Sequence, residues 1–153
     1  MRFRVLAVGP RQPAWVTEGV EEYRRRLPGL EVVELPLSRR AKGQPPGPAR
    51  DDEGRRLLAR LGPQDHVVAL EVDGATHDTA ALARRVEVWL GLGRPVSFLI
   101  GGPDGLSAGV RARAEESWSL SPLTLPHGLA RVVLTEALYR AWSVLQGHPY
   151  HRD

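Results

Sequence analysis

The sequence of 153 residues contains no cysteine. A disulfide framework and an iron–sulfur cluster are therefore excluded, and the usual zinc sites are not expected. No apolar run approaches the roughly 20 residues that are needed to cross a bilayer. The first nine residues, MRFRVLAVG, form too short an apolar stretch for a signal peptide. We therefore expect a cytoplasmic protein without membrane contact.

Several common motifs of active sites are also missing. There is no G-x-x-x-x-G-K-[ST] phosphate loop and no G-x-S-x-G elbow, so NTP hydrolysis and a serine nucleophile have no support. The glycine-rich run Gly101–Gly105 reads Gly-Gly-Pro-Asp-Gly, which departs from G-x-G-x-x-G and comes late in the chain. His127, His148 and His151 match the spacing of no standard metal site, and no metal is expected.

Lysine is nearly absent as well, because 21 residues are basic and all of them except Lys42 are arginine. The planar guanidinium group binds phosphate and stacks on bases. Two clusters, Arg24–Arg26 and Arg39–Lys42, suit contacts with RNA, yet the net charge is only +3. Solvated surfaces and arginine-biased coding explain the same composition, so charge alone leaves both interpretations open.

Apolar segments of strand length alternate with segments of helical periodicity. The expected strands are 4–8, 31–35, 66–70, 96–100 and 117–120, and the expected helices are 15–26, 51–61, 79–90, 107–116 and 129–146. Asp51 and Asp52 would lie in the first turn of their helix, and the proline-rich segment 38–48 would be a flexible loop. The alternation predicts an α/β fold with a mostly parallel sheet flanked by helices, as one domain over residues 1–153.

Ligands of open parallel sheets bind beyond the carboxyl ends of the strands. Three such ends are notable here, at 70–74, 100–107 and 120–127. In the second of them the glycines remove Cβ atoms, so that a ligand can approach the backbone closely. A tight Pro-Asp-Gly turn without any ligand is the plain alternative.

The end of the chain, His148–Asp153, carries two imidazoles, a phenol and a guanidinium. The helix before it stops near Gly147 and would deliver these groups to a defined place. A solvated terminus is the alternative interpretation.

Four strings of the sequence resemble the RlmH family, the ribosomal large subunit pseudouridine N3-methyltransferases of the SPOUT superfamily. The strings are FLIGGPDG at 98–105, SLSPLTLPH at 119–127, LTEALYRAWS at 134–143 and HPYHR at 148–152. The resemblance also reaches the first strand and the segment PAWV at 13–16, whereas segment 38–48 matches least.

The resemblance implies a C-terminal trefoil knot, a homodimer and methylation of N3 of a pseudouridine in 23S rRNA of the assembled ribosome. It further implies S-adenosylmethionine as the cofactor. From what methyl transfer to a ring nitrogen needs, we expect Arg152 to stabilise negative charge on the base, His151 to accept the proton or hold the base, and Tyr150 to stack on it or hydrogen-bond to it. Carried over residue by residue, the cofactor contacts fall on Leu70, Gly101, Leu120, Ser121, Pro122, Leu123, Thr124 and Leu125. The alternatives are a non-catalytic ribosome-binding or RNA-binding protein and a Rossmann-type nucleotide-binding enzyme.

Overall fold

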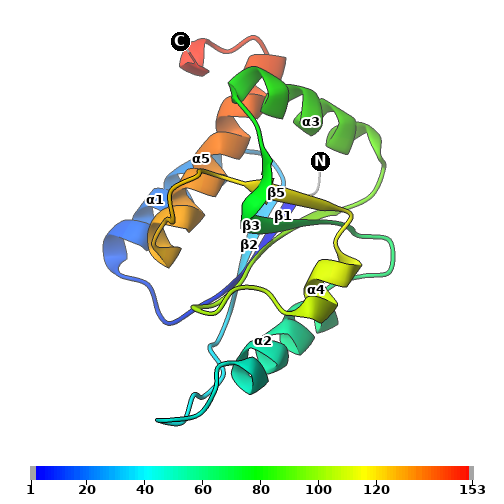
Figure 1. Cartoon of the computed structure of the whole chain (residues 1–153). Coiled ribbons are helices and arrows are strands. Elements are labelled where there is room, and N and C mark those ends of the chain that lie inside the picture. Colours follow the sequence, from blue (N-terminus) through cyan, green and yellow to red (C-terminus); the bar gives the residue numbers. More distant parts are fainter. Residues whose placement is uncertain (1–2, 152–153) are drawn as a thin grey trace.

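A computed structural model describes residues 3–151, without the side chain of His151. Its centre is a five-stranded sheet in the order β2-β1-β4-β3-β5, and all four neighbouring pairs are parallel (Figure 1). The strands are β1 (Phe3–Val8), β2 (Leu30–Leu35), β3 (His66–Thr76), β4 (Val96–Ile100) and β5 (Glu116–Ser119). The predicted α/β class with a parallel sheet is confirmed.

Helices cover both faces of the sheet. The helices α1 (Ala14–Arg26), α3 (Thr79–Gly91) and α5 (His127–Leu145) lie on one face, and α2 (Gly47–Ala59) and α4 (Ala108–Arg113) lie on the other (Figure 1). Alternate residues of β1 serve the two layers, because Phe3 and Val5 join the first core and Leu6 and Val8 join the second. None of the helices within residues 3–151 is long and apolar enough to span a membrane.

Several predicted boundaries are wrong, most clearly those of α2 and β3. Helix α2 begins at Gly47 and not at Asp51, because proline is tolerated in the first turn of a helix. Its first turn therefore carries no acidic residue, and Asp52 instead pairs with Arg56 one turn later. Strand β3 continues past Leu70 to Thr76 through a shift of register against β5.

The C-terminal part of the chain agrees more closely with the sequence prediction. The side chain of Ser107 accepts a hydrogen bond from the backbone of Val110 and caps α4, although this helix ends at Arg113 and not at Glu116. Helix α5 is followed by Gly147 at φ +71°, a value that favours glycine at the end of a helix. A short 3₁₀ turn, Pro149–His151, comes next. The trefoil knot stays a prediction.

Candidate cofactor cavity

A cavity of about 390 Å³ lies where the three notable strand ends meet. It is lined by the second half of β3, the glycine loop after β4, the loop after β5 and the start of α5. The structure brings together all of the predicted cofactor residues except Pro122 in this one wall: Leu70, Gly101, Leu120, Ser121, Leu123, Thr124 and Leu125. Pro122 does not line the cavity, although it lies within the same loop.

The glycine loop is a tight turn closed by its own backbone. The amide of Gly105 donates a hydrogen bond of 3.0 Å to the carbonyl of Gly102, and Gly105 has φ +78°. A Cβ atom at Gly101 would lie 2.6 Å from the carbonyl carbon of Gly105 and 2.9 Å from the nitrogen of Leu106. The turn can therefore close only because residue 101 is a glycine and has no Cβ atom.

Serine side chains shape the loop after β5. The Ser119 hydroxyl donates to the carbonyl of Ser121 at 3.0 Å, and the Ser121 hydroxyl accepts from the amide of Leu123 at 2.9 Å. Because these side chains satisfy backbone groups locally, the loop keeps a fixed course without regular secondary structure. It leads through Pro126 directly into α5.

One ion pair stands in the wall of the cavity. The Arg111 guanidinium donates to the carboxylate of Glu71, which also lies 3.3 Å from the hydroxyl of Ser117. Both Glu71 and Arg111 line the cavity, together with Asp73 and His127. Carboxylates accept hydrogen bonds from hydroxyl and amino groups, so this side of the cavity suits a polar ligand with such donors. Among the described side chains, which exclude that of His151, no three His, Asp or Glu residues form a group that would hold a metal ion.

Comparison with known proteins identifies the family. The sequence model described as "Predicted SPOUT methyltransferase" matches residues 1–151. The chain belongs to the SPOUT methyltransferase family. It is 58% identical to the ribosomal RNA large subunit methyltransferase H of Alkalilimnicola ehrlichii over 99% of both chains. It is 51% identical to the protein of the same name from Hahella chejuensis over the full length of both.

A solved structure supports the same fold. The SpoU methyltransferase AviRb from Streptomyces viridochromogenes, in complex with AdoMet, matches with a TM-score of 0.50 and 18% identity. The match covers 96% of this chain and 59% of that chain. At this identity the likeness concerns the fold, which is the SPOUT arrangement of a parallel sheet between two layers of helices.

Among the predicted catalytic residues, the structure describes the side chain of Tyr150, which stands apart from the larger cavity. The Tyr150 phenol lies 3.2 Å from the hydroxyl of Tyr23 and 3.2 Å from a carboxylate oxygen of Glu136, and its ring packs on Tyr139 at 4.7 Å. Burial, together with Tyr23 and the charge of Glu136, raises the pKa of the Tyr150 phenol above its usual value. Arg152 and the side chain of His151 lie outside the described residues.

A second cavity, of about 160 Å³, lies next to the residues that Tyr150 contacts. Glu136 and Arg140, which both contact Tyr150, line it together with His77 and Trp118. Leu120 lines both cavities. Tyr150 therefore docks beside the smaller cavity and not beside the larger one.

The structure separates the two arginine clusters that the sequence presents as equivalent. Arg24 pairs with Glu21, and Arg25 and Arg26 pair with Glu22, all along the exposed side of α1. In the second cluster Arg39 and Lys42 are exposed, whereas Arg40 pairs with Glu53 and Asp104. Arg40 is thus engaged within the protein.

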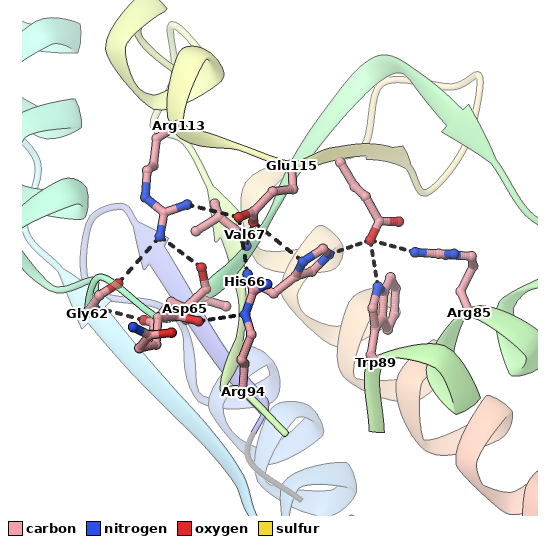
Figure 2. A network of polar contacts seen from close by, with 12 residues as sticks. Gly62, Asp65, His66, Val67, Arg85, Trp89, Arg94, Arg113 and Glu115 are labelled. Atoms are coloured by element: carbon pink, nitrogen blue, oxygen red, sulfur yellow. Dashed lines mark hydrogen bonds and ion pairs between the residues drawn. The ribbon is translucent and has the colours of Figure 1, made fainter. Parts of the chain in front are cut away.

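A polar network that the sequence did not predict lies at the opposite end of β3 (Figure 2). One carboxylate oxygen of Glu116 lies 2.5 Å from His66 Nε2, 2.7 Å from Trp89 Nε1 and 2.7 Å from the Arg85 guanidinium. Burial opposes the charged form of Glu116, but these donors outweigh it and lower the pKa of the carboxyl. The network joins β3, α3 and β5 and stands away from the larger cavity. Its residues are scattered in the sequence, so no local motif reveals it.

Proposed function

We propose that this chain is an S-adenosylmethionine-dependent methyltransferase that methylates N3 of a pseudouridine in 23S rRNA of the assembled ribosome, as a single domain over residues 1–153. The observation that carries the proposal is the cavity, in which three separated segments expected to hold the cofactor meet. The names of the relatives from Alkalilimnicola ehrlichii and Hahella chejuensis, which describe methyltransferases of large-subunit ribosomal RNA, point the same way.

The cavity fits the proposed cofactor. Its volume falls within the range of roughly 300–1,000 Å³ that is usual for small-molecule sites. Its wall contains several leucines, and the glycine loop lets a ligand lie against the backbone. The residues proposed to hold it are Leu70, Gly101, Leu120, Ser121, Leu123, Thr124 and Leu125, together with Pro122, which belongs to the same loop but does not line the cavity. When bound, the cofactor supplies a methyl group already activated by its sulfonium, so a covalent enzyme intermediate is not needed.

The C-terminal tail, residues 148–153, is proposed to act on the pseudouridine base. As N3 of the pseudouridine loses its proton, negative charge spreads to the adjacent carbonyl oxygens, where the Arg152 guanidinium would stabilise it. His151 would accept the proton. The raised pKa of Tyr150 widens the pH range over which its phenol stays protonated, so it is proposed to serve as a hydrogen-bond donor and an anchor of the tail.

A homodimer is proposed as the working form, with the tail of one protomer serving the cavity of its partner. Three large apolar side chains near the start of α1 and α5 are exposed, namely Trp15 at 58%, Leu123 at 73% and Leu129 at 37%. Such a group favours burial against another protein surface. The docking of Tyr150 on α1 and α5, away from the larger cavity of its own chain, supports the exchange of tails.

The decisive experiment is methylation of ribosomes from a strain that lacks this gene. Purified protein and labelled S-adenosylmethionine should yield one labelled nucleotide, which mass mapping should place at N3 of a pseudouridine in 23S rRNA. The Arg152→Ala variant should be slower by about two to three orders of magnitude in single turnover, as when one oxyanion donor is lost. Transfer to another nucleotide, or a rate for Arg152→Ala within a fewfold of wild type, would contradict the proposal.

Calorimetric titration separates the alternatives. A non-catalytic RNA-binding protein would bind neither S-adenosylmethionine nor NAD, whereas a Rossmann-type enzyme would favour NAD. Tight binding of S-adenosylmethionine without binding of NAD is the expected result.

A further inference from the structure

The Arg40 side chain joins three segments that are far apart in sequence. It donates two hydrogen bonds to the carboxylate of Glu53 in α2, at 2.7 and 3.0 Å, and one of 3.1 Å to the carbonyl of Ser38. Its Nε donates to a carboxylate oxygen of Asp104 at 2.9 Å. Arg40 therefore ties the segment after β2 and helix α2 to the glycine loop of the larger cavity.

Glu53 gives this arrangement a rigid base. Its side chain is only 2% exposed, and its carboxylate also accepts the amide of Ser38 at 2.9 Å. A buried carboxylate is stable only when it is paired and hydrogen-bonded, so Arg40 is held on Glu53 whether or not it contacts Asp104. The hydrogen bonds that Arg40 donates to the carboxylates of Glu53 and Asp104 also raise the pKa of Arg40, which stays a cation.

Asp104 lies in the turn that Gly102 and Gly105 close. Gly101, Gly102, Pro103 and Gly105 line the cavity, but Asp104 does not. The Asp104 carboxylate instead meets Arg40 on the side of the turn away from the ligand space. Arg40 thus supports the glycine loop from behind.

We propose that Arg40, acting through Asp104, is a positioning residue that fixes the glycine loop for the cofactor. The inference rests on the proposed function, because it concerns the affinity of the same cavity. A loop with three glycines loses much conformational entropy when it becomes ordered. An ion pair that orders the loop beforehand reduces that loss at the moment of binding, and the affinity for the ligand rises.

Asp104→Ala is the test variant because it leaves the buried pair of Arg40 and Glu53 intact. Isothermal titration with S-adenosylhomocysteine should give a dissociation constant about five- to tenfold higher than that of the wild type. Because partly exposed ion pairs add little stability, the unfolding temperature without ligand should shift by less than about 3 °C. In turnover the defect should appear mainly as a higher KM for the cofactor.

Glu31→Ala is the matched control, since Glu31 is an exposed acid that pairs with Arg4 at 3.8 Å on an edge strand of the sheet. It should bind S-adenosylhomocysteine as the wild type does. An equal loss of affinity in Glu31→Ala would overturn the inference, and so would a change of less than twofold in Asp104→Ala.

A double-mutant cycle with Arg40→Lys separates positioning from any effect of Asp104 on the turn itself. A lysine retains a charge for the buried Glu53 but lacks the fork that reaches both carboxylates. If the contact matters, Asp104→Ala should cost little further affinity once Lys occupies position 40; additive losses would contradict the proposal. Absence of S-adenosylhomocysteine binding by the wild type would instead refute the proposed function.

Discussion

At the scale of single residues, the wall of the cavity depends on the space beside Gly101. A methyl group there would collide with the backbone of Gly105 and Leu106 and would not simply project into the ligand space. A larger residue therefore acts on the ligand indirectly, by opening the turn that lines the cavity. The sequence indicates that glycine is needed, but only the structure shows that the neighbour is the loop itself.

Gly101→Ala should lower the affinity for S-adenosylmethionine at least tenfold in a protein that still folds. The reason is that the backbone of residues 105 and 106 lies so close to residue 101 that a Cβ atom there would force the backbone to shift. Calorimetry measures the affinity, and circular dichroism checks the fold. The control is Gly91→Ala at the end of α3, where a Cβ atom meets nothing within 4 Å. Unchanged affinity in Gly101→Ala would remove the glycine loop from the cofactor site.

Glu116 should make stability depend on acidic pH. Its pKa is held below the ordinary value of 4.5 by donors from Trp89, His66 and Arg85 in the folded state. Its contribution is therefore present above about pH 4.5 and is lost as the pH falls through the lowered folded pKa. Glu116→Gln should reduce the free energy of unfolding by about 1 kcal/mol at pH 7, and the difference from the wild type should shrink toward pH 3. Denaturant unfolding at several pH values measures this, with Glu31→Gln as the control. A difference that stays constant across the range would contradict the role of the charge.

At the scale of elements, the sequence predicts the buried strands and the long helices well. Strand β4 is found at its predicted bounds because Val96–Ile100 is wholly apolar except for Ser97 and is flanked by Pro95 and Gly101. The second half of β3 escapes prediction because Val72 is exposed and Glu71 and Asp73 break the apolar pattern. Pairing with β5 across the register shift sustains this part of the strand, and such a partner is invisible in a local window.

In the segment between β2 and α2, the contacts of the side chains could likewise not be predicted from the local sequence. Its basic residues look alike in sequence, but the carboxylates that engage Arg40 come from α2 and from the glycine loop. Only Arg39 and Lys42 remain exposed for a phosphate backbone. The spatial meeting of the cofactor segments was predictable from sheet topology, whereas the ion pairs that hold them were not.

Arg39→Gln combined with Lys42→Gln should weaken ribosome binding and leave cofactor affinity unchanged. Each lost phosphate contact should reduce the slope of log affinity against log salt by about 0.7–0.9. Filter binding at several salt concentrations gives the slope. The control is Arg24→Gln with Arg25→Gln, which removes the same charge from arginines that are paired along α1. A slope equal to that of the wild type would show that the segment does not contact RNA.

At the scale of the whole molecule, the position of Tyr150 makes the proposed homodimer testable. At a low cofactor concentration Gly101→Ala should leave its cavity largely empty, and deletion of residues 151–153 removes the proposed catalytic end of the tail but keeps the Tyr150 anchor. If tails are exchanged, mixed dimers of the two variants contain one complete site and should recover up to half of the wild-type rate per mixed dimer. If each tail serves its own cavity, neither protomer is complete and the mixture should stay inactive. Mixing after dissociation and reassociation, followed by the methylation assay, distinguishes the two.

The order of the strands also has a consequence for how the chain is made. Strand β4 is synthesised fourth, yet it lies between β1 and β3 and bonds to both, with Phe3 and His66 each paired to Val96. Until β4 leaves the ribosomal tunnel, the pair of β1 and β2 cannot be joined to β3 in one sheet. Such long-range pairing slows folding and keeps the apolar edges of these strands open in the nascent chain. Translation pauses or chaperone contacts before β4 has left the tunnel would therefore affect the yield of this protein more than those that come afterwards.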